Sequence, residues 1–149
     1  MKNGATVAVL LGLYGFVAAF AQAGEAERAQ AYRQGVMNVF SWNMKAMNDM
    51  MKGKSAYDAA AFANHASDLA KATGLDLLPG FPEDSDGDDS DARPDIWFDF
   101  EDFAHKLEDL RGAVQALKKA TMSGDKRAVG EALVKTGKAC KACHEDYRD

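Results

Sequence analysis

The chain has 149 residues, with 23 acidic and 18 basic side chains and a formal net charge of −5 at pH 7. This length is typical of a single domain with a substantial core. The excess of negative charge argues against nucleic acid as a partner, because nucleic-acid-binding proteins present basic surfaces.

The N-terminal segment has the features of a secretory signal peptide. Lys2 precedes an uncharged stretch from Ala5 to Ala21, and Ala21-Gln22-Ala23 fits a small-residue cleavage site. An uncleaved membrane anchor is the alternative, but the stretch is short, diluted by glycine and alanine, and lacks a cationic flank. We expect residues 1–23 to be removed, with cleavage after Ala21 as the second choice. The mature domain, residues 24–149, would then lie in the periplasm without membrane attachment.

Helical periodicity of the apolar residues begins directly after this segment. The first predicted helix covers residues 25–52, and its apolar seam alternates spacings of three and four: Met37, Phe40, Met44, Met47 and Met51. Gly53 follows as a stop signal. The stretch from Ser55 to Asp58 resembles a capping box for a second helix, which is expected to end near Gly74. The inner face of this second helix is predicted to consist of Phe62, Ala66, Leu69 and Ala70.

A long link, residues 75–98, separates the second helix from the third. It contains all three prolines of the chain and an acidic run from Glu83 to Asp91. The alternating acids are similar to a calcium-binding loop, but Asp89 stands where that loop requires glycine. We therefore expect a solvated loop rather than a metal site.

Two further helices are predicted after the link. The third opens at Asp99, with Glu101 and Asp102 in its first turn, where negative charge is favourable. Its apolar seam is Phe103, Leu107, Leu110, Val114 and Leu117. After a short turn, the fourth helix aligns Val129, Leu133, Thr136, Cys140, Cys143 and Tyr147. Short connections join antiparallel neighbours, so the sequence predicts an all-α, antiparallel four-helix bundle in which helices one and two pair, as do three and four.

The last predicted helix carries Cys140-Lys141-Ala142-Cys143-His144, the attachment signature of c-type haem. Residues three apart share a helix face, so both sulfurs can reach the vinyl groups on one edge of a porphyrin. His144 stays near that face and can supply the proximal ligand of the iron. The sequence thus predicts one covalently attached haem c on the C-terminal helix. Export fits this prediction, because bacteria form the thioether bonds of c-type cytochromes outside the inner membrane.

Other uses of the two cysteines fit the sequence less well. A thiol redox pair belongs at the start of a helix after a strand, whereas this pair lies late in a helix. A zinc site needs four ligands, and the other two histidines, His65 and His105, lie on distant helices. We expect neither of these histidines to bind iron. A disulfide between helical residues three apart has poor geometry. A haem-free helical binding module with an incidental thiol pair is the alternative from a different class of protein.

A haem motif near the C-terminus of a secreted four-helix bundle resembles the class II cytochromes c, and cytochrome c′ most of all. Supporting matches occur at residues 32–34, 52–60 and 92–97, beside the specific match at residues 137–148. The resemblance implies that Cys140 and Cys143 carry the thioethers and that His144 forms the proximal bond to the iron.

The resemblance also implies roles outside the haem motif. Arg33 and Gln34 match positions beside the haem and its propionates, and Arg148 matches an arginine on the proximal side. Ser85 and Asp86, in the long link, match further haem-contact positions. For Arg33 and Arg148, surface ion pairing is the alternative.

By the same resemblance, Met37 occupies the distal side of the iron. In cytochromes c′ an apolar side chain usually blocks this position without binding, which leaves a five-coordinate iron open to small uncharged gases such as NO and CO. In low-spin relatives a methionine here binds the iron, which favours electron transfer. The resemblance implies a periplasmic haem protein of the first kind, which binds NO or CO, transfers electrons, or both. A six-coordinate electron carrier with Met37 as sixth ligand is the alternative.

Nothing in the sequence points to an enzyme, because no nucleophile–base arrangement, phosphate loop or paired acid is recognisable. We expect an unidentified redox protein as a partner. The resemblance further implies a homodimer formed through the first two helices. The surface predicted for this contact is the outer side of helix one, which is expected to expose Val36, Trp42 and Met50.

Overall fold

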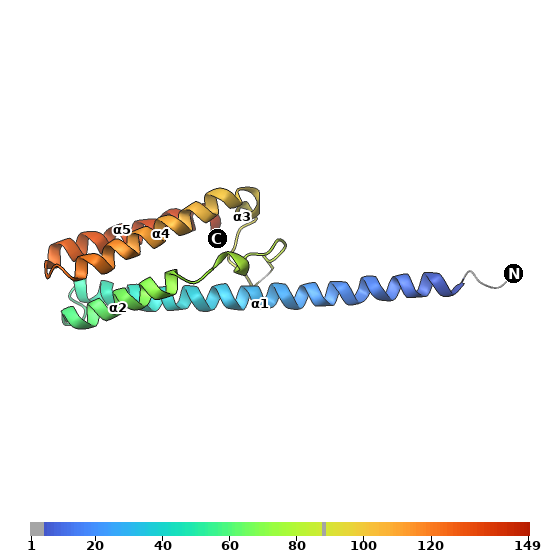
Figure 1. Ribbon diagram of the computed structural model, residues 1–149, viewed down its shortest axis with the longest axis horizontal. Coiled ribbons are helices and arrows are strands. Elements are labelled where there is room, and N and C mark those ends of the chain that lie inside the picture. Colours follow the sequence, from blue (N-terminus) through green and yellow to red (C-terminus); the bar gives the residue numbers. More distant parts are fainter. Residues whose placement is uncertain (1–4, 88) are drawn as a thin grey trace.

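The computed structural model describes the backbone of residues 5–87 and 89–149, and the side chains of residues 24–87 and 89–149. Its four long helices are α1 (Ala5–Met51), α2 (Ala59–Thr73), α4 (Phe100–Thr121) and α5 (Lys126–Tyr147) (Figure 1). The link between α2 and α4 contains a short 3₁₀ helix, η1 (Leu78–Gly80), and a single helical turn, α3 (Asp95–Phe98). The predicted signal peptide, residues 1–23, lies outside the residues that are described in full. Over the described part of the chain, no helix combines the length and apolar character that crossing a membrane requires.

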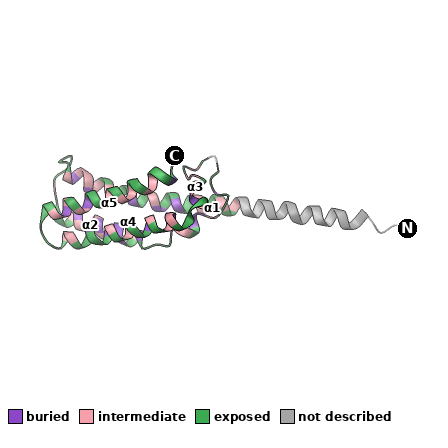
Figure 2. Cartoon of the chain, turned by 90° about the horizontal axis from the view of Figure 1, so that it is seen from above, coloured by how far each residue is buried: buried purple, intermediate pink, exposed green. Residues whose placement is uncertain are grey.

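The helices form the antiparallel bundle that the sequence predicts. α1 pairs with α2, α4 pairs with α5, and α2 packs on α4 to join the two pairs (Figure 1). Buried residues face the interior between the helices, and exposed residues cover the outside (Figure 2). α1 and α5 contact each other over little of their length, and the cavity described below lies between them.

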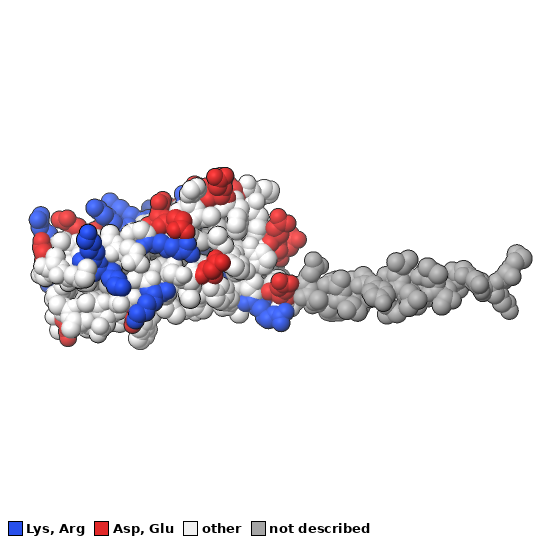
Figure 3. Space-filling model, in the orientation of Figure 1, with Lys and Arg blue, Asp and Glu red and all other residues white. Residues whose placement is uncertain are grey.

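The long link is exposed at its acidic residues and anchored at its apolar ones. Glu83 and Asp86 are exposed, whereas Leu77 and Phe81 are buried. On the face shown in Figure 3, acidic side chains gather at the end of the bundle where the link and α3 lie. The expectation of a solvated loop holds for these acids but is wrong for Ser85, which is only 2% exposed because it is held by an arginine of α1.

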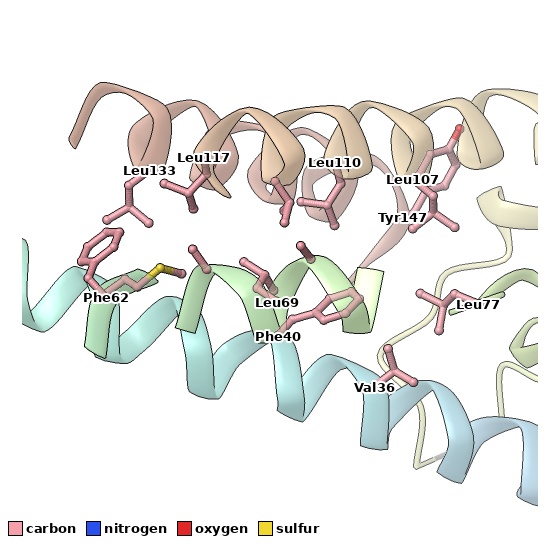
Figure 4. Close-up of a cluster of buried hydrophobic side chains, with 14 of the residues drawn as sticks. Val36, Phe40, Phe62, Leu69, Leu77, Leu107, Leu110, Leu117, Leu133 and Tyr147 are labelled. Carbon is pink, nitrogen blue, oxygen red and sulfur yellow. The ribbon is translucent and has the colours of Figure 1, made fainter. Parts of the chain in front are cut away.

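The core consists largely of the apolar seams predicted for α2, α4 and α5. Every residue assigned to the inner faces of α2 and α4 is buried, and so are Val129, Leu133, Thr136 and Tyr147 of α5. Figure 4 shows Phe62 and Leu69 of α2 directed toward the leucines of α4 and α5. Each such side chain stabilises the fold by about 1.5–3 kcal/mol relative to remaining exposed.

The seam predicted for α1 is rotated relative to the buried face. The buried residues are Arg33, Val36, Phe40, Asn43, Met47 and Met50. The predicted exposure of Val36 and Met50 is therefore wrong, since they are 6% and 7% exposed, whereas Trp42 is 72% exposed as expected. The reason is that two polar residues, Arg33 and Asn43, belong to the buried face. The apolar residues alone therefore predict a helix face that is rotated away from the one that is buried.

Asn43 illustrates how a polar side chain is accommodated in this face. Its Nδ2 donates to the carbonyl of Val39 at 2.9 Å, and its Oδ1 lies 3.0 Å from Nδ1 of His65 on α2. Both ends of the amide are therefore satisfied, which removes most of the cost of burying it. His65 thus serves in a contact between helices.

Aspartates cap the beginnings of three helices. Asp99 caps α4 and accepts a hydrogen bond from the Asp102 N–H at 3.2 Å, as predicted. Asp125 caps α5 in the same way. The capping box predicted to begin at Ser55 is wrong, because the N-cap of α2 is Asp58 itself, whose Oδ1 accepts from two backbone N–H groups of the first turn. A carboxylate at the cap position satisfies these N–H groups directly and needs no partner three residues later.

Candidate haem-binding site

A cavity of about 590 Å³ opens between α1 and α5 at the end of the bundle where α5 terminates. α4, Ile96 of α3 and residues of the long link complete its walls. The lining is mainly apolar and includes Phe40, Met44, Phe103 and Leu107. The volume is within the range of about 300–1,000 Å³ that is typical of ligand and cofactor pockets.

The cavity collects most of the residues that the sequence singled out. Those that line it are Cys140, Cys143, His144, Arg33, Gln34, Met37 and Arg148. Ser85 and Asp86 do not line it, so their predicted contact with haem stays a prediction. The three residues of the motif come from α5, and Met37 faces the same space from α1.

The two cysteines lie on the wall that α5 contributes. Both are half-buried free thiols. Burial raises the pKa of the Cys140 thiol and raises that of Cys143 to about 11, because a thiolate is poorly solvated there. The pair is therefore neutral at ordinary pH, unlike the reactive thiolates of redox motifs.

His144 lies one turn beyond Cys140 and faces the same cavity. Burial lowers the pKa of its imidazole, and the positive charge of Arg148 lowers it further. Both effects favour the neutral ring, which is the form that binds a metal.

One contact indicates how α1 and α5 are aligned across the cavity. At one end, a Cβ on Gly130 would come within 2.7 Å of Cε of Met51, so the absence of a side chain allows these helices to touch. From this contact the helices run antiparallel toward the cavity. Met37 lies as many residues before Met51 as His144 lies after Gly130. Met37 therefore stands level with His144 on the opposite wall, with its side chain half-buried.

Arg33 is buried and fully engaged with the long link. It donates from Nη1 to the Gly80 carbonyl at 2.8 Å and to Ser85 Oγ at 2.9 Å. From Nη2 it donates to the Ser85 carbonyl and, at 2.8 Å, to Ser90 Oγ. Burial lowers the pKa of Arg33, and the negative charge of Asp86 opposes this shift. Arg33 thus holds the link in place beside the cavity.

Gln34 and Arg148 also hold the link. Nε2 of Gln34 donates to the Asp89 carbonyl at 3.2 Å. Arg148 pairs with the carboxylate of Asp91, with an Nη2–Oδ2 distance of 3.0 Å. The ion pairing considered for Arg148 is therefore present, at a residue that also lines the cavity.

Lys106 also reaches the cavity wall, from α4, although it was not predicted from the sequence. Its Nζ lies 2.9 Å from the Asp146 carboxylate and 3.5 Å from that of Asp102. Asp102 in turn accepts from the Tyr147 hydroxyl at 2.7 Å. This network joins α4 to the end of α5. The spacing of Asp102 and Lys106, four residues apart on one helix, is the only signal of it in the sequence.

The donor set of the cavity suits haem c. Two thiols on one helical face meet a mainly apolar space, an imidazole stands beside them, and a thioether faces that imidazole from the other wall. Cys140 and Cys143 would hold the macrocycle and His144 the iron.

A protein-family model described as cytochrome C′ matches residues 28–148. The chain belongs to the cytochrome c′ family. This match covers nearly the whole domain predicted after the signal peptide. It confirms the resemblance inferred from the sequence and, with it, a covalently attached c-type haem as the cofactor of the family.

Individual members of the cytochrome c′ family agree with the match along their full length. Cytochrome c′ of Halomonas halodenitrificans is 35% identical over 130 residues, which cover 83% of this chain and 98% of the relative. The solved structure of cytochrome c prime from Shewanella frigidimarina superimposes with a TM-score of 0.80 at 34% identity, covering 84% of this chain and 97% of that one. The nitric oxide complex of a variant of cytochrome c prime from Alcaligenes xylosoxidans has a TM-score of 0.75 at 30% identity, covering 84% and 97%.

Proposed function

We propose that this protein is a periplasmic cytochrome c′ whose five-coordinate haem iron binds NO or CO, with electron transfer as a further capacity. When bound, the haem supplies an iron that takes axial ligands and exchanges an electron. The observation that carries the proposal is that Met37 of α1 and His144 of α5 line the same mainly apolar cavity from opposite walls. The relative from Alcaligenes xylosoxidans, of which a nitric oxide complex has been solved, supports NO as a ligand.

Each wall of the cavity has a separate task in this proposal. Cys140 and Cys143 fix the macrocycle to α5, and His144 supplies the proximal ligand. The half-buried side chain of Met37 covers the distal side from α1. Phe40 and Met44 extend this apolar cover, which favours small neutral ligands over anions because a charged group is costly to transfer into such surroundings.

The second candidate is a six-coordinate electron carrier in which Met37 binds the iron. The same observation favours it, because a methionine side chain is flexible and Met37 faces the position of the proximal ligand. The two candidates differ in whether the thioether reaches the iron. In the carrier, a diatomic gas has to displace sulfur before it binds.

Absorption spectra of the purified holoprotein separate the two candidates. The five-coordinate proposal predicts a broad, high-spin ferrous Soret band and rapid CO binding, both largely retained in Met37→Leu. A sharp low-spin spectrum that responds to CO only after Met37→Ala would establish the electron carrier instead. A denaturing gel stained for haem peroxidase activity tests the attachment, since a protein with only free thiols stays blank.

We also propose a homodimer that forms through the outer face of α1. Val39 and Trp42 are 46% and 72% exposed on this face, one turn apart on the side away from the core. Large exposed apolar side chains of this kind mark contact surfaces. The haem protein is further expected to exchange electrons with a redox protein that is not yet identified.

A further inference from the structure

Two arginines that line the cavity are attached to neighbouring residues of the long link. On α1, Nη2 of Arg33 donates to Ser90 Oγ at 2.8 Å. Just after α5, Arg148 contacts Oδ2 of Asp91 with Nη2 at 3.0 Å and Nε at 3.2 Å. Ser90 and Asp91 line the cavity as well. We refer to these contacts, Arg33–Ser90–Asp91–Arg148, as the cross-cavity bridge.

The bridge is anchored on both walls. On the α5 side, Ala92 and Arg148 form an antiparallel β-bridge, and the Asp149 N–H donates to the Asp91 carbonyl at 3.0 Å. On the α1 side, Arg33 is only 4% exposed. Its guanidinium also donates to the Gly80 carbonyl and to Ser85 Oγ, which belong to two further segments of the link. A displacement of either wall therefore has to be transmitted through residues 90 and 91, or break these contacts.

The anchors lie close to Met37 and His144, the residues that would face the two sides of a bound haem. Arg33 precedes Met37 by four residues and Arg148 follows His144 by four, so each arginine is about one helical turn from an axial residue. The bridge therefore spans the cavity about one helical turn away from Met37 and His144.

The opposite end of the α1–α5 interface is closed by Met51 against Gly130. The two helices thus meet at that contact and are connected again through the link, beyond Met37 and His144. The bridge makes this second connection together with Gln30 and Gln34, which donate to the Asp89 carbonyl. Between these points lies the cavity. Such an arrangement makes the bridge one determinant of how far α1 stands from α5 beside the cavity.

We propose that the cross-cavity bridge is a spacer that sets the separation of Met37 from His144, and thereby the fraction of the protein in which the Met37 thioether reaches the haem iron. Ser90 and Asp91 are positioning residues in this scheme, since neither occupies an axial position. The inference rests on the proposed function, because it takes the haem to lie between these two walls.

The direction of the effect follows from the apolar character of the walls. Without the bridge, α1 keeps its packing against α2 and its hydrogen bonds to Gly80 and Ser85, but it loses a restraint on its distance from α5. Approach of the walls removes apolar surface from water, which is favourable, and it shortens the path from the Met37 sulfur to the iron. Because an exposed ion pair is a modest interaction, we expect a roughly two- to fivefold increase in the ratio of Met37-bound to unbound iron.

Asp91→Ala and Asp89→Ala form a matched pair for the test. Each removes one carboxylate from the same loop, so the change in net charge is equal. The Asp89 carboxylate makes no hydrogen bond or ion pair with any described residue, and the Asp89 carbonyl that accepts from Gln34 is retained. Ser90→Ala removes the hydroxyl that accepts from Arg33 and from the Ala92 N–H, so it breaks the bridge without changing the charge of the loop. The measurements are made on holoprotein with the haem content and far-UV circular dichroism of the wild type.

The low-spin fraction, from absorption and electron paramagnetic resonance, and the rate of CO association are the readouts. Asp91→Ala and Ser90→Ala should raise the low-spin to high-spin ratio roughly two- to fivefold and slow CO binding to a similar extent. Asp89→Ala should match the wild type. Adding Met37→Leu to Asp91→Ala should abolish the extra low-spin signal, which a general loss of stability would not explain.

Equal spectra and CO rates in Asp91→Ala, Ser90→Ala and Asp89→Ala would overturn the inference, as would a low-spin signal that survives Met37→Leu. If the iron of the wild type is already low-spin because Met37 binds it, the proposed five-coordinate function is overturned. The role of the bridge can still be tested separately. In that case Asp91→Ala and Ser90→Ala must change the rate at which CO displaces Met37 relative to Asp89→Ala. Equal displacement rates would then reject the bridge.

Discussion

Arg33 carries a buried charge that is satisfied by neutral oxygens. Its guanidinium donates to two backbone carbonyls and two serine hydroxyls and lies 5.0 Å from the centre of the Phe81 ring. A planar fork of donors is needed to reach acceptors in several directions at once. The residue therefore organises the link between α2 and α4, in addition to the place beside the haem that the resemblance implies.

Replacement of Arg33 by methionine should destabilise the fold substantially. The variant retains apolar bulk but leaves the carbonyls of Gly80 and Ser85 without their donor, for an expected loss of about 2–4 kcal/mol in the free energy of unfolding. Urea denaturation of the holoprotein measures this loss. Arg28→Met, at an exposed position of the same helix, is the control and should stay within about 0.5 kcal/mol of wild type. Similar losses in the two variants would contradict the structural role.

The contacts of Asp102 predict that the stability of the fold is sensitive to acid. The hydrogen bond from the Tyr147 hydroxyl, supported by the charge of Lys106 and opposed by desolvation, holds the pKa of Asp102 below its usual value. A carboxyl whose pKa is depressed on folding stabilises the folded state above its unfolded pKa, about 3.9. This contribution is lost as the pH falls through the folded pKa.

Asp102→Asn should therefore flatten the acid limb of the stability curve. Below about pH 4, the free energy of unfolding of the wild type should decrease more steeply than that of the variant, because only the wild type must protonate a hydrogen-bonded carboxylate. Denaturant unfolding at a series of pH values measures both slopes. Asp109→Asn, on the same helix and exposed, should follow the wild type. Parallel curves for wild type and Asp102→Asn would show that the contact has no such effect.

Among the elements, α2 depends most clearly on its N-cap. Asp58 Oδ1 accepts from the N–H groups of Ala60 and Ala61 at 2.8 and 3.0 Å, whereas Ser55 lies outside the helix. Asp58→Ala should reduce the free energy of unfolding by about 1 kcal/mol. Ser55→Ala should change it by less than about 0.5 kcal/mol. Thermal unfolding of both variants provides the comparison, and a larger loss in Ser55→Ala would restore the capping box that the sequence suggested.

Helix faces were predictable where the buried residues are all apolar. The inner faces of α2 and α4 follow directly from their periodicity, because every third or fourth residue is apolar and buried. On α1 the same reasoning failed, since Arg33 and Asn43 belong to the buried face. Their partners lie on η1, α2 and the long link, and no local pattern in the sequence indicates that a polar residue has such partners.

The same distinction between local and distant information applies to the site. Cys140, Cys143 and His144 were predictable because the motif lies within five consecutive residues of one helix. The contacts of Arg33 with Ser90 and of Arg148 with Asp91 each join residues 57 positions apart. Their hydrogen bonds depend on the path of the link, which has no regular secondary structure at these residues. They became recognisable only when the fold brought the middle of α1 and the end of α5 to one cavity.

At the scale of the whole molecule, the proposed homodimer depends on which residues α1 exposes on its outer side. The face predicted from sequence was wrong in two of its three residues, because Val36 and Met50 are buried. Trp42 remains, and Val39 joins it on the outer side of α1. An exposed tryptophan is the kind of side chain that dominates the binding energy of an interface.

Trp42→Arg should therefore separate the dimer without unfolding the protomer. Loss of an interfacial tryptophan costs about 2 kcal/mol or more, which corresponds to a roughly thirtyfold rise in the dimer dissociation constant. Light scattering coupled to size-exclusion chromatography, over a range of protein concentrations, measures the shift. Phe98→Arg is the matched control, because Phe98 is 88% exposed and belongs to α3, which lies apart from α1 in Figure 1. If both variants weaken the dimer equally, or if the wild type is a monomer throughout, the outer face of α1 is not the dimer contact.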